Sequence, residues 1–283
     1  MNTRTSITVL RRLIVMNRSR RHEIEKLADS LREKCSVIDY GFQNIFESAE
    51  KAGFVVIRYP VGLESFLGFA MIKDGDRIVF SNSSQILSRE IFSIAHEIGH
   101  HCLHLASTGK ILIKDDNFQN SDEQETEANY FAGCLLVPQD KLEKYIRLEL
   151  NDIDPNSFNG LHIAKIQNAF NSSFDTVLIR MKDLRLIDSK KYEELKAEKA
   201  ATTVTRFLNV INGNLDLNRI SESKKIPPVF LEWVISNYQQ KLIPKSSLER
   251  ALRYVDLTAD DFGNESIEDE VDEEFDELFR RME

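Results

Sequence analysis

Two histidines and a glutamate within five residues are the most reactive group in the sequence. In the segment His96-Glu97-Ile98-Gly99-His100 the two histidines are four residues apart. On a helix this spacing places both imidazoles on one face, so they can bind the same metal ion. Glu97 lies about 100° around the helix from His96, close enough to act as a base on a water bound to that metal. The pattern therefore predicts a metal site with a catalytic carboxylate beside it.

A third ligand must come from elsewhere, because a catalytic zinc ion takes three protein ligands and keeps one position open. His104 shares the face of His96 but would lie roughly 12 Å from it along a straight helix, too far for one ion. The segment ETEANYFA, which begins at Glu125, is a better source. Glu125 can ligate the metal while Asn129, one turn later, bonds to a ligand histidine and fixes its tautomer. The alternative is ligation by Glu127, and we favour Glu125.

These residues need helices and strands to position them. Alternating and β-branched residues predict strands at 54–59, 68–72 and 77–81, with a hairpin turn at Asp74-Gly75. Ser88 is the expected N-cap of a helix that carries the two histidines to about Leu105. A second long helix, capped by Ser121 or Asp122, should carry Glu125 and end before Pro138. Further helices are expected at 21–34, 42–52, 141–150, 163–187 (two helices around 171–173) and 190–200.

The order of these elements, mixed first and helical afterwards, predicts an α+β fold. We expect a small twisted sheet with the HExxH helix and a second ligand-bearing helix, followed by helical C-terminal extensions. The expected parts are a basic N-terminal segment (1–21), a domain that carries the zinc site (22–155), a helical, helix-turn-helix-like unit (156–200), a C-terminal helical region (201–259) and an acidic tail (260–283).

The net charge of −9 is unevenly distributed. Residues 260–283 contain twelve acids and two arginines, whereas the first 34 residues carry nine Lys or Arg and four acids. We interpret the basic head as a solvated amphipathic helix, with contact to nucleic acid or to an acidic partner as the alternative. The acidic tail is interpreted as a solvated or frayed helix, and its three large apolar residues, Phe275, Leu278 and Phe279, could dock on a partner or fold back.

Composition excludes several classes of protein. Hydrophobic residues make up 42% of the chain, enough to bury a core. No apolar run approaches about 20 residues, so we expect no membrane helix. The apolar stretch 6–16 is interrupted by Arg11 and Arg12 and is a poor signal peptide. Three cysteines argue against a disulfide scaffold and for a reducing compartment, so we expect the cytoplasm.

Taken together, the two motifs resemble a known family. HEIGHHCLH at 96–104, followed after a polar gap by ETEANYFAGCLLVP at 125–138, resembles the ImmA/IrrE family of zinc metallo-endopeptidases. The strands expected before the first motif fit this resemblance, which spans about residues 22–140. The combination of HEIGH with ExEANxFAxxLLxP is far more specific than HEIGH alone.

The resemblance implies a gluzincin-like site, with His96, His100 and Glu125 as zinc ligands and Glu97 as the catalytic base. Members of the family commonly cleave a helix-turn-helix repressor that is encoded beside them. We therefore expect an endopeptidase of narrow specificity that cleaves a repressor or antitoxin-like partner in a phage, mobile-element or stress response. The alternative is a DNA-damage or partner-sensing regulatory protein whose metal site is structural or vestigial.

Direct binding of nucleic acid has weak support. The segment 161–187 has the pattern of a helix-turn-helix unit, but only Arg180, Lys182 and Arg185 follow its turn as basic residues. We favour a helical unit that packs beside the peptidase.

Overall fold

The computed structural model of the protein describes residues 16–105, 112–114 and 122–258. Most of the basic N-terminal segment and the acidic tail (260–283) lie outside these residues. The strands are β1 (Phe54–Tyr59), β2 (Gly68–Lys73), β3 (Asp76–Asn82) and β4 (Leu112–Lys114). The helices are α1 (Arg18–Lys34), α2 (Ile45–Lys51), α3 (Leu87–His100), α5 (Asp122–Leu136), α6 (Gln139–Glu149), α7 (Gly160–Phe170), α8 (Phe174–Asp183), α9 (Ser189–Ala201), α10 (Val204–Val210), α11 (Pro228–Gln239) and α12 (Lys245–Arg253). The short elements are η1 (His101–Leu105), η2 (Pro155–Ser157) and η3 (Leu215–Asn218).

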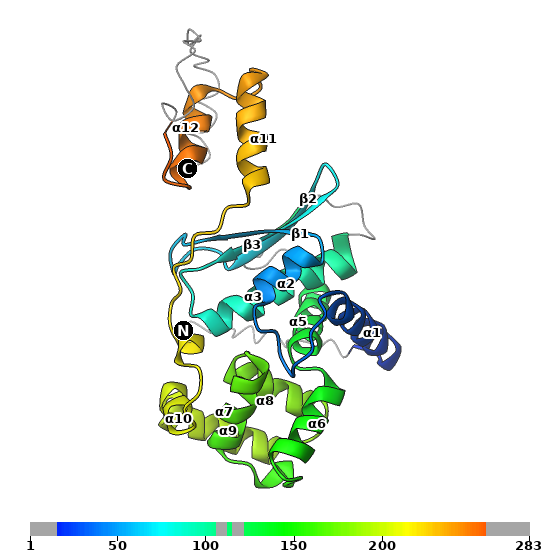
Figure 1. Ribbon diagram of the computed structural model, residues 1–283. Helices are drawn as coiled ribbons and strands as arrows, with labels where there is room; N and C mark the ends of the chain where they lie inside the picture. Colours follow the sequence, from blue (N-terminus) through cyan, green and yellow to red (C-terminus); the bar gives the residue numbers. More distant parts are fainter. Residues whose placement is uncertain (1–15, 106–111, 115–121, 259–283) are drawn as a thin grey trace, which may run out of the picture.

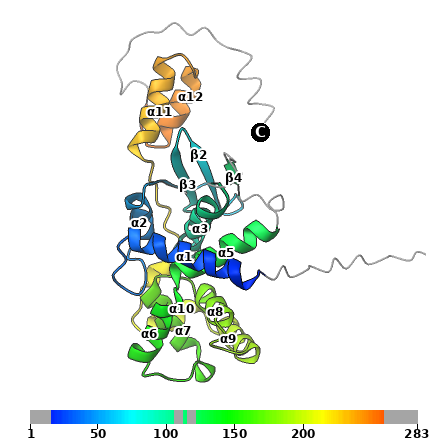
Figure 2. The ribbon, with the colours of Figure 1, turned by 90° about the vertical axis from the view of Figure 1, so that its right-hand side faces the viewer.

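The sheet is small and mixed, in the order β1-β3-β2-β4. The β2–β3 hairpin is antiparallel, and its turn residues Asp74 and Gly75 have φ values of 52° and 93°. Positive φ at both positions is what a tight two-residue hairpin requires, so the predicted turn is confirmed. β1 joins β3 in parallel, with Val56 opposite Val79. β4 was not expected; it pairs with β2 through three residues (Figure 2).

The fold is α+β, as predicted, and the predicted strands lie within one or two residues of β1, β2 and β3. In Figure 1 the sheet lies above α3, with α6–α10 grouped below and the α11–α12 pair above the sheet. One hydrophobic core runs from Ile24 of α1 to Leu217 of η3. Helices α6–α10 and η3 therefore bury apolar side chains in the same core as the two motifs, whereas α11 and α12 contribute no residue to it.

The start of α3 differs from the prediction. The helix begins at Leu87, and Ser88 lies buried in its first turn and does not cap it. The N-terminal backbone is supported instead from a distance, because the Leu87 N–H donates to the carbonyl of Arg219 at 2.8 Å. An N-cap signal in the local sequence was therefore the wrong guide to this end of the helix.

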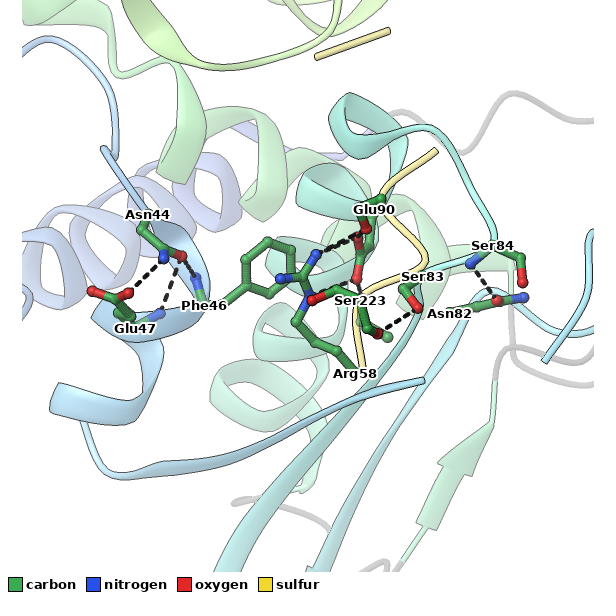
Figure 3. Close-up of polar contacts among 11 residues, drawn as sticks. Asn44, Phe46, Glu47, Arg58, Asn82, Ser83, Ser84, Glu90 and Ser223 are labelled. Atoms are coloured by element: carbon green, nitrogen blue, oxygen red, sulfur yellow. Dashed lines mark hydrogen bonds and ion pairs between the residues drawn. The ribbon is translucent and has the colours of Figure 1, made fainter. Parts of the chain in front are cut away.

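Residues 219–225, which we call the strap, connect η3 to α11 and cross the sheet's edge. Arg58 and Lys225 exchange backbone hydrogen bonds of 2.9 and 2.8 Å, and Glu222 N–H donates to Ser83. Ser83 Oγ in turn donates to the Ser223 carbonyl at 2.7 Å (Figure 3). The strap thus joins β1, β3 and the start of α3 to the C-terminal helices.

Glu90 of α3 lies at the centre of this region. Its fully buried carboxylate accepts hydrogen bonds from Arg58 Nε and Nη2 at 2.8 and 2.7 Å, and from Ser81 and Ser221 hydroxyls at 2.8 and 3.1 Å. The Arg58 guanidinium also stacks 3.7 Å from the ring centre of Phe46 (Figure 3). These contacts fix the N-terminal half of α3 to the sheet, to α2 and to the strap.

α3 and α5 approach closely because the contact is made through a glycine. A Cβ at Gly99 would lie 3.1 Å from the Phe131 ring and 3.3 Å from Ala128. The glycine of HEIGH therefore lets α5 lie against the histidine-bearing helix, and this contact brings Glu125 opposite His96 and His100.

The two helices expected around 171–173 are α7 and α8, and Asn171 ends α7 in the left-handed conformation with φ of 46°. Arg180, one of the three basic residues that follow the turn, is buried and donates to the Val137 carbonyl. It therefore belongs to the core and not to a recognition surface. In the described part of the chain, no helix has both the length and the apolar character needed to cross a bilayer.

Candidate metal centre

His96, His100 and Glu125 converge on one point between α3 and α5. His96 Nε2 lies 2.9 Å from His100 Nε2. The Glu125 carboxylate faces both nitrogens, with Oε2 3.2 Å from His96 Nε2 and Oε1 3.3 Å from His100 Nε2. Tetrahedral ligands with bonds of about 2.0–2.1 Å to zinc lie roughly 3.3 Å apart. The observed spacing therefore fits a single zinc ion, and these three residues could hold one.

The outer nitrogens of both histidines have partners that bear on the tautomer. His96 Nδ1 lies 3.1 Å from Oδ1 of Asn129, one turn after Glu125 on α5. An amide oxygen only accepts, so the Nδ1 of His96 carries the proton and its Nε2 presents a lone pair to the centre. The position of Asn129 is the one that the spacing predicts for a residue that orients a ligand histidine.

The electrostatics of the centre favour an anionic Glu125. Burial on its own would raise the pKa of this carboxyl, but the neighbouring imidazoles of His100 and His96 hold the pKa well below its usual range. A permanent anion and two imidazole nitrogens within 4.8 Å form a set of donors suited to a divalent cation.

Glu97 is fully buried beside this centre. Gly68 of β2 makes room for it, because a Cβ at Gly68 would lie 2.9 Å from Glu97 Oε1 and 2.9 Å from the Phe80 carbonyl. Strand β2 can thus pass directly over the carboxylate. Sequence reasoning did not identify Gly68, and a glycine at the start of a strand was the one available signal.

Glu127 is not one of the three candidate ligands His96, His100 and Glu125, which we call the triad. Its carboxylate contacts a histidine and an arginine instead. His104 Nδ1 lies 3.0 Å from His100 Nδ1, and His104 Nε2 lies 3.1 Å from Glu127 Oε2. Arg20 of α1 donates two hydrogen bonds to the same carboxylate, from Nε at 2.7 Å and from Nη2 at 2.6 Å. The arginine holds the pKa of Glu127 below its usual value, and burial lowers the pKa of His104. The basic neighbour of Glu127 is therefore Arg20, and sequence reasoning did not identify its contact with His104.

Three other polar or ring side chains near the two motifs, Tyr130, His101 and Tyr59, have partners elsewhere. Tyr130 donates to Glu25 at 2.6 Å, and His101 Nε2 lies 2.8 Å from the Ile78 carbonyl. Tyr59 packs edge-on against Tyr254. In the arrangement described, these three groups do not point at the triad.

A cavity of about 790 Å³ opens beside the centre, between α3, α5, α8 and the start of α1. Thr126 and Asn129, which flank the triad on α5, line one wall, and Phe92 of α3 lines another. The Phe92 ring centre is 6.5 Å from that of His96. A concave, largely apolar site next to a candidate metal centre is suited to receive a substrate side chain.

Comparison with known proteins gives a family match for the part of the chain that contains this site. A search of curated proteins finds no match. Residues 49–182 match Peptidase_M78, described as the IrrE N-terminal-like domain. The match contains the sheet, both ligand-bearing helices and the helices up to α8, and it supports a metallopeptidase-like function. Residues 49–182 thus resemble an IrrE N-terminal-like domain, and this match supports an ImmA/IrrE family assignment.

Proposed function

We propose that this protein is a zinc-dependent endopeptidase of narrow specificity, whose substrate is a helix-turn-helix repressor or an antitoxin-like protein. The observation that supports the proposal best is the convergence of three ligand atoms from His96, His100 and Glu125 beside the buried carboxylate of Glu97. The family match supports the class of reaction. The substrate class is proposed from the resemblance of the two motifs to the ImmA/IrrE family.

Each residue has a distinct task in this proposal. His96, His100 and Glu125 would hold zinc, which when bound would lower the pKa of a water and polarise the peptide carbonyl. Glu97 accepts the proton of the attacking water and passes it to the leaving amine. Asn129 keeps the His96 ring in the tautomer that presents Nε2 to the centre.

The cavity beside the centre supports a role in substrate selection. Its volume of about 790 Å³ accommodates a large side chain. Asn129, which lines its wall, contacts the candidate ligand His96 directly. A bond positioned at the metal centre would place a neighbouring residue of the substrate in this cavity. Narrow specificity then follows from the shape and polarity of that wall.

The test uses the full-length protein and a variant that keeps the ligands. Metal content is measured first, and we expect about one zinc per chain. Glu97→Gln should retain that zinc and bind the substrate without cleaving it, so it can serve as a trap for the partner in the native cell. The trapped protein is then incubated with the wild-type protein, with and without a chelator. Cleavage that requires zinc and Glu97 supports the proposal, and a trapped partner that stays intact with zinc-loaded wild type refutes it.

The complete burial of Glu97 favours one alternative, a partner-sensing regulatory protein in which the metal site is structural. In that case, Glu97→Gln should complement a deletion strain as well as wild type does. Loss of complementation with retained zinc would exclude this alternative.

A further inference from the structure

A row of four side chains leads away from the metal centre to the N-terminal helix. It consists of His100, His104, Glu127 and Arg20, and we call it the His104 network. Successive contacts measure 3.0, 3.1 and 2.6–2.7 Å. The members come from α3, the π-helical turn η1, α5 and α1, and His100, His104 and Glu127 are buried. An uninterrupted series of this kind, with a charged pair at its outer end, orients each member in turn.

The donors and acceptors of the network can be assigned from its ends. Arg20 only donates, so Glu127 accepts from it and also accepts from His104 Nε2. His104 then carries its proton on Nε2 and presents a lone pair at Nδ1. That lone pair accepts from His100 Nδ1–H, which leaves His100 Nε2 unprotonated and directed at Glu125 and His96. The direction set by Arg20 is therefore the one that metal ligation by His100 requires.

We propose that His104, Glu127 and Arg20 are positioning residues that fix the tautomer and ring orientation of His100, so that helix α1 is physically coupled to the metal centre. The inference rests on the proposed function to the extent that His100 ligates zinc. η1 contributes by its local geometry, since a π-helical turn directly after HEIGH presents His104 to His100 and Glu127 together.

The same contacts also contribute to folding, so the test must separate the two roles. The probe is zinc alone, and its dissociation constant is measured by competition with a chromophoric chelator on the full chain. His104→Phe and Glu127→Gln should each weaken zinc binding about 10–100-fold. Glu123→Gln makes the same chemical change at an exposed position of α5 and should leave the affinity unchanged.

Two further readouts respond to positioning and not to stability. In the His104→Phe/Glu127→Gln double variant the losses should be strongly non-additive, because one break already uncouples His100. The visible spectrum of the cobalt-loaded protein should shift in both single variants and stay unchanged in Glu123→Gln. Arg20→Gln alters the partly exposed end of the network, and it gives the same test if a buried substitution prevents folding.

The outcomes distinguish this inference from the proposed function. Wild-type protein that takes up no zinc would refute the proposed function itself. Wild-type protein that binds zinc, together with folded variants that bind it equally tightly and give an unchanged cobalt spectrum, would overturn the positioning role alone. Additive losses of affinity would likewise show that the residues act separately and not as one network.

Discussion

Replacing Glu90 with glutamine should cost a large part of the protein's stability. The carboxylate is fully buried and accepts four hydrogen bonds, two of them from Arg58. Glutamine has almost the same shape, but it is neutral and its amide nitrogen would face groups that donate. Arg58, itself 12% exposed at its side chain, would then be a charge without its partner.

The size of the effect follows from these contacts. Removing one member of a buried ion pair costs about 3–5 kcal/mol. The hydroxyl of Ser221 donates to Glu90 at 3.1 Å and accepts from Arg58 Nη2 at 3.2 Å, both at the exposed edge of the group, so Ser221→Ala should cost only about 1–2 kcal/mol. Since domains are stable by about 5–15 kcal/mol, Glu90→Gln should remove about a fifth or more of the free energy of unfolding.

Urea denaturation followed by circular dichroism measures both values. With a slope of about 2–3 kcal/mol per molar urea, the midpoint for Glu90→Gln should fall by about 1–2 M. Glu64→Gln, the same change at an exposed site, is the control and should not move it. The reasoning is refuted if Glu90→Gln unfolds at the urea concentration of wild type, or if Ser221→Ala costs as much as Glu90→Gln.

Further outcomes are expected at other sites. Glu125→Gln should reduce bound zinc from about one per chain to a small fraction by mass spectrometry, and full occupancy would contradict its role as a ligand. Gly68→Ala places a methyl group 2.9 Å from Glu97 Oε1, so the carboxylate must move by about 0.5 Å. Cleavage of the trapped partner should therefore slow about tenfold while zinc is retained. Unchanged cleavage would contradict this role of Gly68. Gly41→Ala sets a Cβ 2.3 Å from the Phe170 backbone and should lower the melting temperature by about 5–10 °C in calorimetry. Burial raises the pKa of Cys134 to about 12, so its thiolate is scarce at pH 8, and alkylation of the native protein should be slow there and accelerate as the pH rises; rapid labelling at pH 8 would show that the thiol is accessible.

Local patterns were a good guide where local chemistry decides the structure. β1 is the segment FVVIRY, and the turn at Asp74-Gly75 forms because these residue types tolerate positive φ. The relation between His96 and His100 follows from helical periodicity alone. Predicting that Glu125 lies beside them required a second motif on another helix. The four-residue spacing of Glu125 and Asn129, which places both on one helix face, supplied that motif.

Features that depend on distant segments could not be predicted. The start of α3 at Leu87 depends on a carbonyl of the strap more than 130 positions later, so Ser88 gave a false signal. β4 is three residues long and has too little pattern to be detected. Arg20 and Glu127 are 107 positions apart, and nothing in either local sequence indicates that they meet.

The strap has a consequence for how the molecule behaves in a crowded solution. An edge strand carries free N–H and C=O groups that can pair with the edge of another molecule and seed aggregation. On β1, the backbone N–H and C=O groups of Arg58 are paired with those of Lys225. The Lys225 side chain also donates to Glu50 at 2.7 Å. The strap therefore covers the Arg58 position of this exposed edge. A protein cut before residue 219 would lose this cover and should precipitate even if its zinc ligands were intact.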